Sequence, residues 1–430
     1  MDARRKFHSP LDMNHMRAAI RLAQRGYGTT SPNPMVGAVL VQNGKIIGRG
    51  WHRRAGGPHA EIGALRDAQK RGHSAGGATL YVTLEPCCTH GRTPPCTEAI
   101  IAAGIQRVVV GTTDPNPRHA GRAFKILRRA GIEVTTPGSA SVPPASPSTG
   151  RSATRRRDAG APRADTLADE CVRLNEAFNH WIVHRTPFVT VKAAMTLDGK
   201  IATASGESKW ITGEKARAHS MKLRQGSDAI LVGINTILAD DPSLTVRVKS
   251  RGQGNIELPT PINREQASNI QHPRPRRIVL DSMARTPLTA KVVSDKHAAL
   301  TTIVVCKSAP KNRVAALSKH VNVVVAPVSK SSIVNRQSSI NLRWLLKKLG
   351  AEDVTSLLVE GGGEVNASFL LGGFAQRVAF FYAPKILGGR DSRKGVAGEG
   401  AKSLADAIRL CDVEWKRLGR DLLLTARVIS

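Results

Sequence analysis

Two short segments of the chain offer one imidazole, several thiols and one carboxylate. They read Pro58-His59-Ala60-Glu61 and Glu85-Pro86-Cys87-Cys88-Thr89-His90-Gly91-Arg92-Thr93-Pro94-Pro95-Cys96. A zinc ion held by one histidine and two cysteines keeps a fourth position for water, and it lowers the pKa of that water toward neutrality. The two segments therefore predict a catalytic zinc site, which constrains the fold to bring them together.

The clustering of the cysteines favours a metal site over ordinary buried thiols. A single cysteine is often a small buried hydrophobic residue, and a histidine near a helix start is often only hydrogen-bonded. Here three of the six cysteines fall within ten positions, beside prolines that fix the loop. Cys87 and Cys88 are adjacent and project differently, so at most one of them is expected to join Cys96 and His59.

Glu61 follows the histidine by two residues and is not needed as a ligand. A carboxylate in that position can move protons between water and a leaving group. The pattern His-x-Glu followed by Pro-Cys is typical of zinc-dependent nucleobase deaminases, although their Cys-x-x-Cys spacing is shorter than the spacing found here.

Further motifs around these segments identify a family. They are Ser31-Pro32-Asn33-Pro34-Met35-Val36-Gly37, Gly50-Trp51-His52 and Asp114-Pro115-Asn116-Pro117. Together with the segment 85–96, they closely resemble the bifunctional riboflavin-biosynthesis deaminase/reductase family. The resemblance implies that Cys87 is the first thiol ligand and that Cys88 is a departure from the family pattern. It also implies a substrate pocket for the pyrimidine and ribose phosphate, formed by Asn33, His52, Arg92, Asp114 and Asn116.

The second half of the chain carries a glycine-rich turn at residues 357–366, Leu-Leu-Val-Glu-Gly-Gly-Gly-Glu-Val-Asn. The pattern predicts a strand, a glycine turn and a helix start. Backbone N–H groups in such a turn can approach a phosphate, and the helix N-terminus favours negative charge. The turn is not the Gly-x-Gly-x-x-Gly fingerprint, and a glycine turn is often only a tight connection.

This half resembles the reductase domain of the same family over residues 192–200, 205–212 and 236–247 and at the glycine turn. The resemblance implies a fold similar to dihydrofolate reductase and the use of NADPH. The implied cofactor contacts are Ala194, Trp210, Thr236, Asp240, Ser282, Gly361, Gly362, Gly363, Glu364, Val365, Asn366 and Ala367. The implied substrate contacts are Ser208, Arg224, Leu244, Arg247 and Glu360, with the two arginines on its phosphate. Lys192 and Asp240 are expected to assist at the reacting carbon.

The hydrophobic patterns predict an α/β protein, and the family resemblance implies an N-terminal cytidine-deaminase-like layered domain and a C-terminal dihydrofolate-reductase-like domain. In the first region, helices are expected at residues 13–25, from about 60, 97–103 and 121–130, and strands at 36–41, 45–49, 79–83, 107–111 and near 134. Asn43-Gly44 is a strong hairpin signal between the first two strands. In the second region, strands are expected at 188–194, 229–232, 277–280, 302–305, 321–326 and 356–359, and helices at 214–225 and 342–349.

The composition changes abruptly between the two halves. Residues 138–164 are rich in Ser, Pro, Ala, Gly, Thr and Arg and show no apolar periodicity, so we expect a flexible linker there. The expected domains are 1–137, a zinc-dependent deaminase, and 165–430, an NADPH-dependent reductase. A helix capped by Asp165 is expected to run to about residue 184, and residues 249–273 are expected to be a surface insertion.

A formal net charge of +31 raises the possibility of a nucleic-acid partner. Against it, the cations are spread along the chain, aromatic content is only 4%, and no stacking motif is found. A tRNA or nucleotide deaminase is the main alternative, but the long cysteine loop and the reductase half disfavour it. A protein with one catalytically dead half is a second alternative, although all the expected positions are filled.

We therefore expect a phosphorylated pyrimidine substrate, one zinc ion per chain and NADPH, with no specific nucleic-acid partner and no membrane association. Cysteine is sparse and clustered, which fits a reducing compartment, and no secretory signal or membrane-spanning run is visible. A cytoplasmic homo-oligomer is expected.

Overall fold

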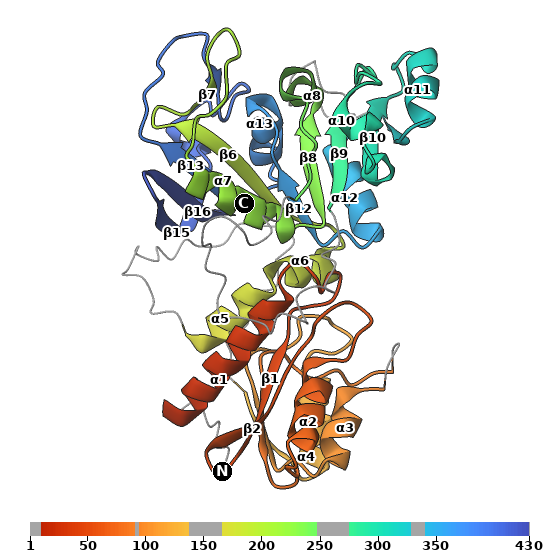
Figure 1. Ribbon diagram of the computed structural model, residues 1–430, viewed down its shortest axis with the longest axis vertical. Coiled ribbons are helices and arrows are strands. Elements are labelled where there is room, and N and C mark those ends of the chain that lie inside the picture. Colours follow the sequence, from red (N-terminus) through yellow and green to blue (C-terminus); the bar gives the residue numbers. More distant parts are fainter. Residues whose placement is uncertain (1–9, 91–93, 137–165, 247–274, 328–339, 430) are drawn as a thin grey trace. The chain divides into compact units, whose positions relative to one another are not determined.

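The computed structural model describes residues 10–90, 94–136, 166–246, 275–327 and 340–429. Their contacts divide the chain into two compact units, Met1–Val183 and His184–Ser430 (Figure 1). The predicted linker and the predicted surface insertion lie outside the described residues. None of the described helices is both long enough and apolar enough to cross a membrane.

The N-terminal unit is built around a five-stranded sheet in the order β2-β1-β3-β4-β5. Its strands are β1 (Gly37–Gln42), β2 (Lys45–Trp51), β3 (Thr79–Val82), β4 (Arg107–Val110) and β5 (Glu133–Thr135). Its helices are α1 (Pro10–Ala23), α2 (Ala60–Lys70), α3 (Cys96–Ala102), α4 (Arg122–Arg129), α5 (Leu167–Leu174) and α6 (Glu176–His184), and a 3-10 turn, η1 (Gln24–Gly26), follows α1. β1 pairs antiparallel with β2 and β3, while β3, β4 and β5 are parallel.

Both faces of this sheet are covered by helices, which explains why the inner strands β1, β3 and β4 are almost continuously buried. Val39 and Val41 pack with α1 on one face, whereas Leu40 packs with α2, α3 and α4 on the other. α2 lies so close to β2 that a Cβ atom at Gly50 would come 2.0 Å from the carbonyl oxygen of Ala60. Glycine at position 50 therefore lets the first turn of α2 settle on the sheet.

The segment after the linker groups by its contacts with the N-terminal unit, which ends at Val183, whereas the sequence predicted that the reductase unit begins at residue 165. Leu167 and Cys171 are buried in the same core cluster as α1, so removing this segment would expose apolar surface. The predicted single helix is two helices, because Asn175 ends α5 and bonds both backbone groups of Met35. The cap is Thr166, which forms a capping box with Asp169, whereas Asp165 lies outside the described residues.

The C-terminal unit contains a nine-stranded sheet in the order β11-β10-β9-β8-β12-β6-β13-β16-β15. The strands are β6 (Phe188–Thr196), β8 (Ala229–Gly233), β9 (Arg276–Leu280), β10 (Thr301–Cys306), β11 (Asn322–Ala326), β12 (Ser356–Val359), β13 (Arg377–Ala383), β15 (Arg409–Leu418) and β16 (Asp421–Ile429). The neighbours from β11 to β13 are parallel, and β16 is antiparallel to β13 and β15. β7 (Lys200–Ala202) and β14 (Arg393–Lys394) form a separate pair.

Helices cover this sheet as well. They are α7 (Glu214–Gln225), α8 (Ile234–Asp240), α10 (Lys291–Ser294), α11 (Lys311–Ser318), α12 (Leu342–Ala351) and α13 (Gly363–Leu371), with 3-10 turns η2 (Ala298–Leu300) and η3 (Leu404–Asp406). α12 and α13 bury Leu345 and Phe369 against one face, and α8, α10 and α11 cover the other. The parallel strands place the loops that follow β6, β12, β8 and β9 along one edge, where ligands bind in open α/β sheets.

The α/β class is confirmed, and most predicted elements appear within a few residues of their expected positions. The hairpin at Asn43-Gly44 joins β1 and β2, and the predicted spans of α7 and β12 are confirmed. The sequence patterns did not identify β7, β13, β14, β15 and β16, nor helices α8, α10 and α11.

Candidate active sites

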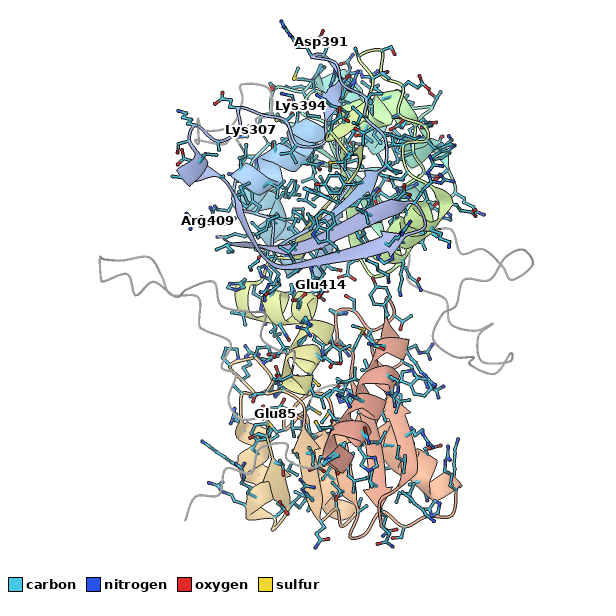
Figure 2. All side chains as sticks on the ribbon, turned by 90° about the vertical axis from the view of Figure 1, so that its left-hand side faces the viewer. Glu85, Lys307, Asp391, Lys394, Arg409 and Glu414 are labelled. Carbon is cyan, nitrogen blue, oxygen red and sulfur yellow. The ribbon has the colours of Figure 1, made fainter. Side chains whose placement is uncertain are left out.

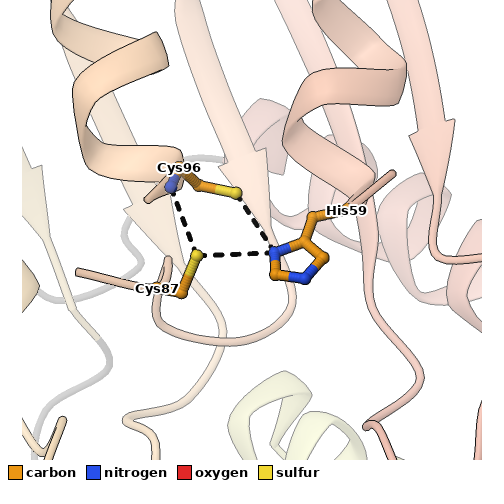
Figure 3. Close-up of side chains that lie close together, drawn as sticks. All are labelled: His59, Cys87 and Cys96. Atoms are coloured by element: carbon orange, nitrogen blue, oxygen red, sulfur yellow. Dashed lines mark hydrogen bonds between the residues drawn. The ribbon is translucent and has the colours of Figure 1, made fainter. Parts of the chain in front are cut away.

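Three side chains converge on one point of the N-terminal unit (Figure 3). His59 is the N-cap of α2, Cys96 is the first residue of α3, and Cys87 lies in the loop after β3. Nδ1 of His59 lies 3.4 Å from Sγ of Cys87 and 3.3 Å from Sγ of Cys96. The backbone N–H of Cys96 also donates to Sγ of Cys87 at 3.2 Å, which fixes the loop against the start of α3.

This cluster fits a tetrahedral metal ion. Ordinary Zn–S and Zn–N bond lengths with tetrahedral angles place a sulfur and a nitrogen ligand about 3.6 Å apart. The two observed S···N distances are close to that value, and the three ligand atoms all lie within 4.8 Å of one another. The set supplies three protein ligands, so a fourth position would stay open, as it does in catalytic zinc sites.

The cluster favours one thiolate even without a metal ion. A hydrogen bond with the thiol of Cys96 lowers the pKa of Cys87, burial opposes this shift, and His59 adds to it. The same bond raises the pKa of Cys96. Both thiols lie near helix N-termini, where negative charge is stabilised.

Glu61 stands in the first turn of α2 with only 3% of its surface exposed. Burial is the main cause that raises the pKa of its carboxyl to about 7, and the nearby Cys87 adds to this shift. A carboxyl with a pKa in this range can both accept and release a proton near neutral pH.

Cys88 lies outside this cluster. Its sulfur lies 3.7 Å from Nδ1 of His119, in the loop before α4. Burial raises the pKa of Cys88, whereas that of Cys87 is lowered. The geometry therefore separates the two adjacent thiols, which residue type alone could not do.

Two predicted pocket residues, Asn33 and His52, lie beside the cluster. The ring of His52 meets that of His59 edge to face at 5.5 Å. Nδ1 of His52 lies 3.1 Å from the carbonyl oxygen of Pro58, and Nε2 lies 3.2 Å from Nδ2 of Asn33. One neutral tautomer satisfies both bonds, with Nδ1 as the donor, and burial lowers the pKa of His52 accordingly. His52 thus fixes the backbone directly before His59.

Asp114 and Asn116, also predicted for the pocket, lie in a loop held by the buried side chain of Glu85 (Figure 2). The Glu85 carboxylate accepts hydrogen bonds from the backbone N–H groups of Asp114, Gly121 and Ala123. Asp114 in turn accepts from the N–H of Asn116 at 2.8 Å. Arg92 lies outside the described residues.

The C-terminal unit contains a cleft of about 920 Å³ along the carboxyl edge of its sheet. Eight residues predicted for the cofactor or the substrate line it. They are Ser208, Thr236, Asp240, Ser282, Gly362, Gly363, Glu364 and Val365. They come from four separate segments, so only the folded sheet brings them together.

Close packing requires glycine at two positions of the turn, whereas the third position faces open space. A Cβ atom at Gly363 would meet the carbonyl oxygen of Lys394 at 2.3 Å, and one at Gly361 would meet Val365 at 2.5 Å. Nothing lies within 4 Å of the corresponding point at Gly362. The turn thus presents bare backbone to the cleft at the N-terminus of α13, which suits a phosphate group.

Other predicted cofactor residues lie outside the cleft lining. Asn366 and Ala367 are fully buried in α13, and the side-chain amide of Asn366 donates to the carbonyl of Gly395 at 2.8 Å. They support the segment around Lys394, which does line the cleft. Ala194 packs with α7, and Trp210 is 67% exposed, with the guanidinium of Arg217 over its ring.

Arg224, Glu360 and Lys192 form a charge cluster next to the glycine turn. Arg224 binds both carboxylate oxygens of Glu360 at 3.0 and 2.7 Å, and its Nη1 donates to the carbonyl of Thr245. Burial would raise the pKa of Glu360, but the charges of Arg224 and Lys192 lower it to about 2. Burial lowers the pKa of Lys192, and Glu360 opposes this shift.

The remaining predicted substrate residues are Ser208, Leu244 and Arg247. The hydroxyl of Ser208 donates to Asp240 at 3.1 Å, and Lys209 lies 3.7 Å from the same carboxylate oxygen. Leu244 is buried at a left-handed backbone position, with a φ of 48°. Arg247 lies outside the described residues.

Several cleft residues were missed by sequence reasoning. Asn235 follows β8, Arg285 lies in the loop after β9, and Arg393 and Lys394 form β14. In a chain with 64 lysines and arginines, residue type gives no signal for these cations. The position of Asn235 and Arg285 directly after buried strands was the available signal.

Comparisons with known proteins cover both units. The family model for the RibD C-terminal domain matches residues 187–424, and that for the cytidine and deoxycytidylate deaminase zinc-binding region matches residues 10–112. The chain is 40% identical to the riboflavin biosynthesis protein RibD of Aquifex aeolicus, over 96% of this chain and 98% of that protein. It is 38% identical to RibD of Actinobacillus pleuropneumoniae, over 99% and 97%.

Solved structures give the same result. A structure of Acinetobacter baumannii RibD aligns with a TM-score of 0.75 at 32% identity, covering 98% of this chain and 99% of that one. The Thermotoga maritima diaminohydroxyphosphoribosylaminopyrimidine deaminase/5-amino-6-(5-phosphoribosylamino)uracil reductase aligns with a TM-score of 0.71 at 32% identity, covering 97% and 99%.

Proposed function

The chain belongs to the family of bifunctional riboflavin-biosynthesis deaminase/reductases, and we propose that its two units carry out the two reactions with the residues described above. The deaminase acts on 2,5-diamino-6-(5-phosphoribosylamino)pyrimidin-4-one, and the reductase then converts the ribosylamino group to ribitylamino. The observation that supports the assignment of residues is that His59, Cys87 and Cys96 converge in one unit, while eight of the residues predicted for the second reaction line one cleft in the other. We assign residues 1–183 to deamination and 184–430 to reduction.

In the N-terminal unit, His59, Cys87 and Cys96 would hold the zinc ion. When bound, zinc lowers the pKa of a water molecule in its open position. Glu61 takes a proton from the attacking water and delivers it to the departing ammonia, a role that its burial and its place in the first turn of α2 support. Asn33, His52, Arg92, Asp114 and Asn116 would bind the pyrimidine and its ribose phosphate.

In the C-terminal unit, the glycine turn would hold the diphosphate of NADPH, with Thr236, Asp240 and Ser282 contacting the cofactor. When bound, NADPH supplies the hydride that reduces C1′ of the ribosylamino group. Ala194 and Trp210 remain proposed contacts, whereas the buried positions of Asn366 and Ala367 suit a supporting role.

The charge cluster would orient the second substrate. Ser208, Leu244 and Glu360 are proposed substrate contacts, and Arg224 and Arg247 are proposed for its phosphate. Glu360 accepts two hydrogen bonds from Arg224 and interacts electrostatically with Lys192, so it balances the charge of both cations. Lys192 and Asp240 would assist proton transfer at the reacting carbon.

We further propose that the enzyme is a cytoplasmic homo-oligomer without a specific nucleic-acid partner. The reactions need only small phosphorylated ligands, and a few cations suffice for these. A tRNA or nucleotide deaminase with an accessory domain is disfavoured, because the similarity to RibD proteins spans 96–99% of the chain.

A test of the proposed function uses the full chain loaded with zinc under anaerobic conditions. With the diaminopyrimidinone ribosyl phosphate alone, ammonia should be released and the deaminated product should accumulate. Added NADPH should then be oxidised in proportion to the amount of deaminated product. Deamination of a tRNA in preference to this substrate, or the absence of NADPH oxidation with purified deaminated product, would contradict the proposal.

A further inference from the structure

We propose that Arg285, held by Asn235, recognises the 2′-phosphate that distinguishes NADPH from NADH. The two residues line the same cleft as the glycine turn. The inference rests on the proposed placement of the cofactor in this cleft. It assigns the residue that sets cofactor specificity, a different task from binding the diphosphate.

The order of the strands gives the direction of the cofactor. β6, β12, β8 and β9 are parallel neighbours, so the loops after them lie side by side along one edge. The glycine turn follows β12, and Lys192 lies in β6, the neighbour of β12 on the side opposite to β8. If the diphosphate binds at the glycine turn and the reacting end lies toward β6, the adenosine end lies toward β8 and β9. Asn235 and Arg285 follow those two strands.

Strand spacing supports this arrangement. Neighbouring strands lie about 4.8 Å apart, so the loop after β9 is roughly 10 Å from the turn after β12. This distance suits the adenosine half of a dinucleotide whose diphosphate lies at Gly362. Ser282, already proposed as a cofactor contact, lies in the same loop as Arg285 and lines the same cleft.

The loop that carries Arg285 is fixed on both sides of this residue. The buried carboxylate of Asp281 accepts hydrogen bonds from the backbone N–H and the hydroxyl of Thr286, both at 2.7 Å. Arg313 donates to the carbonyl oxygens of Ala284 and Thr286 at 3.0 and 3.1 Å. Ala284 is buried at a left-handed position, with a φ of 56°. The backbone therefore presents the side chain of Arg285 from a rigid support.

The guanidinium of Arg285 is oriented but not neutralised. Its Nη2 donates to the side-chain oxygen of Asn235 at 3.0 Å, and both residues are exposed. Within the described ranges, no carboxylate forms an ion pair with Arg285, whereas Glu360 takes up the fork of Arg224. The planar fork of an arginine suits a phosphate group, and a neutral amide can hold the fork without competing for the anion.

The cleft is also lined by two cations from a segment that lies beside the glycine turn. Arg393 and Lys394 form β14, which pairs with β7, and the carbonyl of Lys394 lies against Gly363. They are thus associated with the glycine turn and suit the diphosphate or the substrate. This separation makes Arg285 the described cation on the β8 and β9 side of the cleft.

The test compares Arg285→Ala with the full-length parent and with Arg420→Ala, an exposed arginine in the turn between β15 and β16. Loss of a charge-assisted phosphate contact should weaken binding of adenosine 2′,5′-bisphosphate roughly 10- to 100-fold in calorimetry. The same loss should appear in kcat/KM for NADPH, while binding of 5′-AMP and kcat/KM for NADH should not change. Arg285→Lys should retain part of the preference, and Asn235→Ala should cause a smaller loss of the same kind.

The outcomes separate this inference from the cofactor placement. Equal changes for NADPH and NADH in Arg285→Ala, or no change in either, would overturn the role of Arg285. A change in the NADPH/NADH ratio caused by Arg393→Ala instead would place the 2′-phosphate at the opposite side of the turn. If Gly363→Ala leaves the binding of both cofactors intact, the proposed placement of the cofactor itself is wrong.

Discussion

The two sites of this chain use opposite designs. In the N-terminal unit, three ligand atoms within 4.8 Å of one another and one buried carboxyl hold the chemistry. In the C-terminal unit, a cleft of about 920 Å³ draws its lining from loops after several strands. A compact site should fail almost completely when one group is changed, whereas a dispersed site should lose affinity in steps.

The strongest test of this difference is Glu61→Gln. The variant keeps the shape of the side chain but cannot carry the proton, so deamination should fall about 10²- to 10⁴-fold while zinc content stays at one per chain. Reduction of the deaminated substrate should be unaffected. Ammonia release, metal analysis and NADPH oxidation measure the three quantities. Glu98→Gln, an exposed position in α3, is the control and should behave as the parent.

Near-normal ammonia release by Glu61→Gln would show that another group moves the proton. Loss of zinc together with activity would show that Glu61 helps to hold the metal site. Proton transfer in the compact site would then have to be assigned to another group.

The charge cluster departs from this simple contrast, because it is a compact feature next to the glycine turn of the dispersed site. Glu360→Gln would leave Arg224 and Lys192 without their shared counter-charge, and losing one partner of a buried ion pair costs about 3–5 kcal/mol. Urea unfolding of the C-terminal unit at pH 7 should show this loss. Glu352→Gln, which removes a more exposed partner of Arg276 and Lys348, should cost less than about 1 kcal/mol.

Glu360→Gln also tests how the stability of the C-terminal unit depends on pH. The pKa of Glu360 is lowered from 4.5 to about 2 in the folded chain, so its contribution to stability is complete above about pH 4.5. That contribution is lost as the pH falls from about 4.5 toward 2, because protonation removes the counter-charge. The stability difference between the parent and Glu360→Gln should therefore narrow over this range. A difference that is constant from pH 7 to pH 3 would assign the effect to packing.

The contrast between the sites also explains what the sequence could predict. The proposed zinc ligands lie in two contiguous motifs, so the sequence predicts His59, Glu61 and Cys96 as site residues without a structure, and the family resemblance favours Cys87 over Cys88. No such signal in the sequence marks the cleft cations Arg285 and Lys394, because their position in the cleft depends on which strands become neighbours. β15 was missed for a related reason, since its ten residues are mostly exposed and its order depends on pairing with β16.

Two adjacent glycines test whether the dispersed site loses cofactor affinity in steps when single residues are changed. Gly363→Ala would push a Cβ atom against the carbonyl oxygen of Lys394, and the resulting overpacking costs about 1–3 kcal/mol. NADPH binding should weaken by a factor of roughly 5–150 while deamination is unchanged. Gly362→Ala meets no protein atom within 4 Å, so folding stability should stay at the level of the parent. Its methyl group would lie in the open space proposed for the diphosphate, so NADPH binding should weaken in this variant as well. NADPH fluorescence titration and urea unfolding measure the two quantities. A Gly362→Ala variant that binds NADPH as tightly as the parent would show that the diphosphate does not approach Gly362.

The smallest expected effect concerns the thiol next to a zinc ligand, and it tests how sharply the compact site is bounded. The sulfur of Cys88 contacts His119 and lies outside the group formed by His59, Cys87 and Cys96. Cys88→Ser replaces a weak sulfur contact with a hydroxyl of similar size, so zinc content and ammonia release should stay at the level of the parent. Cys87→Ser is the matched control, because it removes a ligand from the adjacent position and should abolish both. If Cys88→Ser loses zinc and Cys87→Ser keeps it, the thiolate assigned to Cys87 belongs to Cys88, and the loop after β3 must rearrange when the metal binds.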